Sequence, residues 1–199
     1  MSARFPSRSV PILSQCLRLF QRFSGAKEGV AAVEFALLLP IFAFIYLMSF
    51  QLTVGFSVAN NADRAASIIA DIVTQEPTTN VAKLDDMYAL AKAIMTPYST
   101  DDLHIKITGV QVDAGGNPTV KWSWKDDGTA AYPAGSAVTL PVELRQPNSF
   151  VAHTEIATVY NYLFFVPSMT SSTAAALDIN KEFYFRQRVG NNVACTNCP

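Results

Sequence analysis

Two places in this chain carry residue types whose spacing could support chemistry. The first is the stretch from Gly29 to Glu34, where a glycine, four small or branched apolar residues and one carboxylate precede a long apolar run. The second is the pair Cys195 and Cys198, two thiols separated by two residues near the C-terminus. A carboxylate deep in a bilayer costs about 2.5–3.5 kcal/mol. Glu34 therefore either reaches water at the membrane boundary or has a partner.

The charges divide at the same place in the chain. Five of the 15 basic residues and one of the 16 acidic residues lie in residues 1–29, which leaves a net charge of −5 for the rest. A basic segment before an apolar run indicates that the N-terminus stays in the cytoplasm. We therefore interpret residues 1–29 as a basic cytoplasmic leader. The acidic remainder makes nucleic acid an unfavourable partner.

The apolar run itself predicts a membrane span. No charged residue occurs from Phe35 to Ala62, and about 20 helical residues cross a bilayer core. Residues 35–54 fit that length, and the run is longer than the roughly 7–15 residues of a signal-peptide core. Pro40 lies inside the run and removes one backbone hydrogen bond, so we expect a kink or local unwinding there.

Beyond the span the helical period continues. Apolar residues recur at steps of three and four on one face, with polar residues on the others; the apolar set is Val58, Ala62, Ala65, Ile69 and Ile72. A proline at position 77 disfavours continuation of the helix. Residues 30–75 are thus predicted to form one transmembrane and amphipathic stem.

Residues 76–199 show patterns typical of a small domain. A second amphipathic helix is predicted from Leu84 to Met95, and after it the apolar period changes from helical to alternating. The predicted strands are 103–112, 120–125, 138–144, 155–165 and 182–189, with a surface loop or short helix at 167–180. Gly109 allows a bulge or change of phase, and Trp122 and Trp124 are expected in the core. The predicted fold class is α+β: a long N-terminal helix followed by a small, mostly antiparallel sheet.

Other residue types that could carry chemistry form weaker patterns. Cys195 and Cys198 have redox-motif spacing, but no helix is predicted after them, so a structural disulfide is favoured over thiol catalysis or metal binding. His104 and His153 have no partners at zinc-ligand spacing and are interpreted as surface or edge residues. The acidic pair before Gly128 is typical of a turn. We expect no catalytic residue, no metal and no cofactor.

The segment Gly29-Val30-Ala31-Ala32-Val33-Glu34-Phe35-Ala36-Leu37-Leu38-Leu39-Pro40 resembles the cleavage site of type IV prepilins. More narrowly, it resembles the TadE/TadG-like pseudopilins of the tight-adherence (Flp, type IVb) pilus system. The segments around Tyr160, Tyr184 and the closing cysteines also look like TadE-like C-terminal regions. Phe35 replaces the tyrosine of the major Flp pilins, and the chain is much longer than they are. Both departures favour a minor pseudopilin.

The resemblance implies a function and a set of partners. A prepilin peptidase would cut after Gly29, and Glu34 of one subunit would pair with the new ammonium group of Val30 on its neighbour. Other pilins and pseudopilins, the inner-membrane assembly platform and membrane lipid would be the remaining partners. The C-terminal domain would lie in the bacterial periplasm, and the chain could enter a surface pilus. The alternatives are an uncleaved single-span periplasmic scaffold and a membrane-anchored thiol oxidoreductase that uses the C-terminal cysteines.

Overall fold

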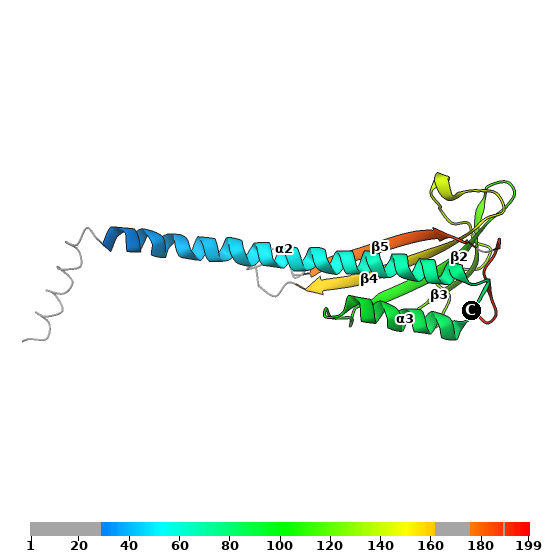
Figure 1. Ribbon diagram of the computed structural model, residues 1–199, viewed down its shortest axis with the longest axis horizontal. Coiled ribbons are helices and arrows are strands. Elements are labelled where there is room, and N and C mark those ends of the chain that lie inside the picture. Colours follow the sequence, from blue (N-terminus) through cyan, green and yellow to red (C-terminus); the bar gives the residue numbers. More distant parts are fainter. Residues whose placement is uncertain (1–28, 162–175, 189) are drawn as a thin grey trace, which may run out of the picture. The chain divides into compact units, whose positions relative to one another are not determined.

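The computed structural model describes residues 29–161, 176–188 and 190–199, so the predicted leader lies outside the described residues except for Gly29. In chain order the elements are α2 (Val30–Gln75), β1 (Thr78–Thr79), α3 (Val81–Met95), β2 (His104–Val112), β3 (Pro118–Lys125), the 3-10 helix η2 (Val142–Leu144), β4 (Phe150–Asn161), β5 (Ala176–Arg186) and β6 (Ala194–Cys195) (Figure 1). A long helix followed by an antiparallel sheet confirms the predicted α+β class.

The chain divides into two compact units between Phe50 and Gln51. The described part of the first unit is Gly29 and the first 21 residues of α2, Val30–Phe50. Every residue from Val30 to Gln75 is helical, so the local unwinding expected at Pro40 is absent. A bend at that proline stays a prediction. The second unit holds the rest of α2, α3 and both sheets.

The main sheet has the strand order β3-β2-β4-β5, and all three pairings are antiparallel. The predicted hairpin of β2 and β3 is present, and its register shifts between Gly109 and Val110 as expected. The extra residue of this bulge is Lys121 on β3, because β2 pairs with β4 without interruption. In a separate two-stranded sheet, β1 and β6 pair in parallel and join the two ends of the domain sequence.

One face of the sheet packs against α3 and the second part of α2 (Figure 1). Four of the five α2 residues that the helical period predicted lie in this core, and Ile72 is only partly buried; Ala66 and Val73 belong to the core although they were not predicted. Helix α3 begins three residues before the predicted start because Asn80 caps it, its side chain accepting a hydrogen bond from the Lys83 N–H.

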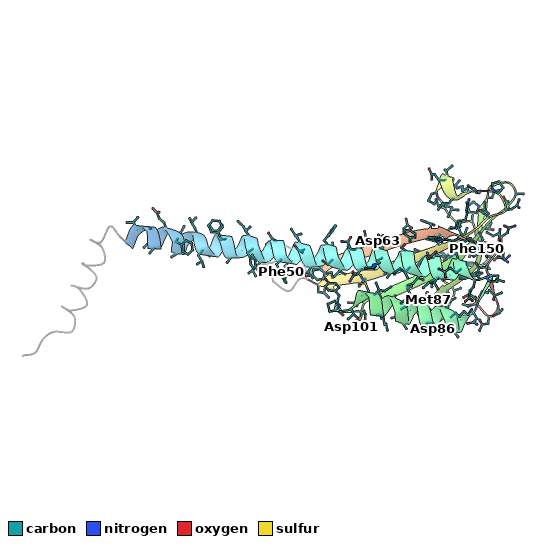
Figure 2. All side chains as sticks on the ribbon, viewed as in Figure 1. Phe50, Asp63, Asp86, Met87, Asp101 and Phe150 are labelled. Atoms are coloured by element: carbon teal, nitrogen blue, oxygen red, sulfur yellow. A yellow bond between two sulfur atoms is a disulfide. The ribbon has the colours of Figure 1, made fainter. Side chains whose placement is uncertain are left out.

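Gly109 is required by the close approach of two aromatic rings in this core. A Cβ atom at Gly109 would lie 2.5 Å from the Trp122 ring and 2.7 Å from the ring of Phe150, which is labelled in Figure 2. The two rings stack with centroids 6.3 Å apart. Trp122 and Trp124 are both buried, which confirms their prediction as core residues. The glycine makes room for the indole beside the bulge.

The outer face of the sheet carries a second, smaller core and corrects one predicted strand. Val110, Val112 and Val151 pack there against Leu140. Residues 138–144 were predicted as a strand, but they form η2 and irregular backbone, with a single bridge from Ala137 to β3. Leu140 is buried by this packing and Val138 and Leu144 are partly buried against it, whereas Val142 is 74% exposed.

Two further strand bounds differ from the prediction. β4 begins at Phe150, five residues before the predicted start, and residues 162–165 of the predicted strand lie outside the described residues. β5 begins at Ala176, so residues 176–180, predicted as loop or helix, are strand; residues 167–175 are not described. β5 is an edge strand paired with β4, and of its first five residues only Ile179 is buried. A local apolar pattern is therefore weak there.

Candidate functional site

The predicted processing site lies where α2 begins. Gly29 is the residue before Val30, the first residue of the helix. No heavy atom lies within 4 Å of a Cβ atom built at Gly29, and Val30 is 54% exposed. The Gly29–Val30 peptide bond therefore has no packed neighbours among the described residues. Glycine also leaves the backbone flexible and removes the side chain next to this bond.

Glu34 lies one helical turn after Val30, and its side chain is exposed in the single chain. Residues four positions apart in a helix share one face. Val30 and Glu34 are therefore presented on the same side of α2. This arrangement can serve a contact between subunits, because the carboxylate and the α-amino group that cleavage would create point from one face.

The described part of the first unit is a helix without a core of its own. Large apolar side chains on all sides of Val30–Phe50 are exposed by 44–70%, among them Phe35, Leu37, Phe42, Tyr46 and Phe50. Helix α2 is long and apolar enough to cross a membrane, and none of the 18-residue apolar stretch that gives it this property is buried. A soluble helix of this composition would bury one face. The exposed surface therefore fits lipid or other apolar helices.

Cys195 and Cys198 form a disulfide in the structure, with Cα atoms 5.6 Å apart. The short loop that the disulfide closes lies against the connection between α2 and α3. The Ala194 N–H donates to the Pro77 carbonyl at 3.0 Å, and the Thr196 N–H donates to the Thr79 carbonyl at 3.2 Å. We call residues 193–198 the C-terminal clamp.

The clamp forms hydrogen bonds with the start of α3 and with β3 of the main sheet. Asn197 Oδ1 accepts a hydrogen bond of 2.9 Å from the Val81 N–H, one of the donors that the first turn of α3 leaves unpaired. The carbonyl of the buried Val193 accepts the indole N–H of Trp122 at 2.8 Å. Both contacts were missed in the sequence, because each joins residues more than 70 positions apart and no local pattern signals them.

A polar cluster on the outer face of the sheet was also missed. Tyr132 donates from its hydroxyl to Glu155, at 2.9 Å to Oε2, and Lys106 lies 3.7 Å from the same carboxylate. Burial, followed by the hydrogen bond to Glu155, raises the pKa of Tyr132 to about 12. Tyr184 has its pKa raised to about 12 by burial and by its hydrogen bond to Glu182. Lys106 and Glu155 also line a cavity of about 330 Å³.

The two histidines have different surroundings. His104 is exposed and lies 2.9 Å from Asp126 Oδ2, as expected for a surface residue. His153 is 5% exposed, so its prediction as a surface or edge residue is wrong. It stacks on Tyr184 at 4.2 Å and its Nε2 lies 3.2 Å from Glu182. Within the described residues, no group of three or more potential ligand side chains could hold a metal ion.

The acidic pair before Gly128 forms a turn, as predicted. Asp127 Oδ1 accepts hydrogen bonds from the backbone N–H and the hydroxyl of Thr129, and Gly128 has a φ of 78°, a left-handed conformation that glycine adopts without strain. The Lys125 side chain, followed by these bonds, lowers the pKa of Asp127 to about 2. Asp126 instead bonds to β2: its Oδ1 accepts a hydrogen bond from the Ile105 N–H, and its Oδ2 lies 2.9 Å from His104 Nδ1.

Fold and site together define a class of protein in which an exposed apolar helix that could span a membrane is followed by an α+β domain with a disulfide near its C-terminus. Residues 29–71 match the family described as TadE-like protein, so this segment of the chain is similar to that family. The match begins at Gly29 and covers about a fifth of the chain, nearly all of it α2. It confirms the resemblance found in the sequence. No curated protein and no solved structure matches the chain.

Proposed function

We propose that this protein is a minor pseudopilin that takes part in assembly of a Flp-type adhesion pilus, and that a prepilin peptidase cuts it after Gly29. The observation that carries the proposal is the TadE-like match, which starts at Gly29, one residue before the helix begins. The protein has no catalytic role of its own in this proposal. Its partners are the peptidase, other pilins and pseudopilins, and the inner-membrane assembly platform.

The exposed start of α2 supports the processing step. A peptidase needs a peptide bond that it can enclose, and no packed side chain among the described residues surrounds Gly29. The basic leader stays in the cytoplasm in this proposal, and the domain that begins at Glu76 lies in the periplasm. An oxidising compartment is also where a disulfide such as that of the clamp persists.

Pairing between subunits provides the Glu34 carboxylate with a partner of opposite charge. After cleavage, Val30 carries a new ammonium group, and the Glu34 carboxylate of a neighbouring subunit can neutralise it. A charge at membrane depth is costly without a partner, and a paired charge favours one register between helices over others. The exposed apolar side chains of Val30–Phe50 then pack against helices of neighbouring subunits when the chain leaves the lipid.

Mass spectrometry of the membrane form tests the processing step. We expect a mature chain that begins at Val30, and an uncut chain in a strain that lacks the prepilin peptidase. Gly29→Val should leave the precursor uncut yet folded and inserted, because a side chain at Gly29 meets no neighbour. Ala31→Val is the matched control, since it enlarges an exposed residue two positions away without touching the bond. A mature chain that still begins at Met1 beside a functional peptidase would contradict the proposal.

The alternative of a thiol oxidoreductase makes a different prediction. Ala194 and Thr196, beside Cys195, donate backbone hydrogen bonds to the connection between α2 and α3, and both cysteines pack against the main core, which supports a structural role. We therefore expect Cys195→Ala/Cys198→Ala to lower stability and to leave thiol–disulfide exchange in the periplasm unchanged. Loss of exchange activity in a variant that is as stable as the parent would favour the enzyme.

A further inference from the structure

The same stretch of α2 is needed to complete the membrane span and to pack against the end of the sheet. Tyr160, near the end of β4, donates a hydrogen bond of 2.7 Å from its hydroxyl to Oε1 of Gln51. A Cβ atom at Gly55 would lie 3.5 Å from the Tyr160 ring and 3.8 Å from Leu177 near the start of β5. The sheet therefore packs on α2 from residue 51 onward.

The helix before that contact is too short to cross a bilayer without help. Between Glu34 and Gln51 lie 16 uncharged residues, which span about 24 Å at 1.5 Å per residue. A hydrocarbon core is about 30 Å thick and takes about 20 residues. Either Glu34 enters the hydrocarbon or the end of the sheet enters the opposite face of the membrane.

Exposed apolar side chains lie at this level of the domain, beside the exposed Asn161 at the end of β4 and the exposed Asp178 on β5. Leu52 and Phe56 on α2 are 69% and 70% exposed, and Leu177 on β5 is 40% exposed. We call these three residues the collar. The first charged residue of α2 after Glu34 is Asp63, seven positions and about 10 Å beyond Phe56; Figure 2 labels Phe50 and Asp63, which bracket the α2 part of the collar.

We propose that the collar is a second membrane contact: Leu52, Phe56 and Leu177 lie in the outer interface of the bilayer, so that the end of the β4–β5 pair is immersed in lipid. Leu52 and Phe56 follow Phe50 by two and six residues on the same helix as the span, and this nearness favours lipid as the occupant of the collar. Glu34 then stays at the cytoplasmic boundary. The proposal depends on the span alone and holds whether or not Gly29 is cleaved.

The polar groups near the collar suit this position. Gln51 is 3% exposed, and its amide oxygen is paired with Tyr160, so the amide is not presented to hydrocarbon. Tyrosine is common at membrane interfaces, where an apolar ring and a polar hydroxyl meet different surroundings. An unpaired glutamine at this depth would oppose immersion, and the hydrogen bond removes that obstacle.

Depth-dependent quenching of tryptophan tests the proposal. The full chain is reconstituted in phosphatidylcholine vesicles whose acyl chains carry bromine near the headgroup or near the bilayer centre. Phe56→Trp and Leu177→Trp place the probe in the collar, where exposed positions accept a larger ring. Phe44→Trp, within the span, is the control for full immersion, and Val142→Trp, 74% exposed on η2, is the control for water.

We expect bromine near the headgroup to quench both collar probes strongly, and bromine at the centre to quench Phe44→Trp. Emission of the parent chain, with its two buried tryptophans, is subtracted. Collar emission quenched no more than that of Val142→Trp would overturn the proposal and place Glu34 in the hydrocarbon instead. A second copy of the chain could instead cover the collar. The collar probes would then be shielded from water but not quenched by bromine, and dilution with excess lipid would remove the shielding. That result would also overturn the proposal.

Discussion

The C-terminal clamp is expected to act as a unit, and a double-mutant cycle can measure this. Removing the disulfide with Cys195→Ala/Cys198→Ala releases a loop of about four residues, for which chain entropy gives a loss of about 2 kcal/mol in the free energy of unfolding. Asn197→Ala removes the acceptor of the Val81 N–H at the start of α3, and lost helix caps cost about 1 kcal/mol.

The two losses should not add. Asn197 lies inside the disulfide loop, so opening that loop lets the chain end leave α3 and removes the Asn197 hydrogen bond as well. The triple variant should therefore be about as stable as the variant without cysteines, with a coupling free energy of about 1 kcal/mol between the two changes.

Guanidinium unfolding of the full chain in detergent, followed by the emission of Trp122 and Trp124, measures each corner of the cycle. Both rings are buried in the main core, so their emission reports unfolding of the sheet domain. Reducing the disulfide of the parent with dithiothreitol should reproduce the cysteine variant. Strictly additive losses would refute the reasoning, because they would mean that Asn197 keeps its bond to α3 when the disulfide is open.

Three further changes probe the sheet domain. Gly109→Ala should lower the free energy of unfolding by about 2–4 kcal/mol in the same assay, because its Cβ would lie 2.5 Å from the Trp122 ring and displace it. The raised pKa of Tyr132 contributes stability that is fully present below pH 10 and is lost as the pH rises from 10 to about 12. Tyr132→Phe should therefore reduce the loss of stability in this alkaline range. At acid pH, the lowered pKa of Asp127 contributes stability above 3.8 that is lost as the pH falls to about 2, and Asp127→Asn should flatten that limb of the stability curve.

Periodicity predicted the elements whose residues are buried along one side. The steps of three and four in α2 and α3, and the alternation in β2 and β3, each reflect a single buried face, so the patterns identify the elements. The same reasoning failed at residues 138–144. There Leu140 is buried by packing over Val110 and Val112, and alternation arises without strand pairing. A sequence pattern records burial and does not record which surface provides it.

The candidate site was predictable only where it is local. Gly29 and Glu34 were found because a short motif contains them, and the cysteines were found because both lie within four positions. The partners of the clamp could not be found in this way. Asn197 caps a helix that begins 116 residues earlier, and an asparagine near a chain end has no feature that indicates such a contact.

The hydrogen bond between Tyr160 and Gln51 marks the point on α2 where apolar span gives way to packed domain, and its energetics should be asymmetric. Tyr160→Phe leaves the Gln51 oxygen without the phenol proton at a buried position, which costs about 1–3 kcal/mol of stability. Tyr160→Phe combined with Gln51→Leu replaces both partners by apolar groups, so much of that loss should be recovered. Unfolding of the full chain in detergent measures both. A double variant less stable than Tyr160→Phe alone would show that Gln51 stabilises the domain through other contacts, and that this hydrogen bond does not place the boundary.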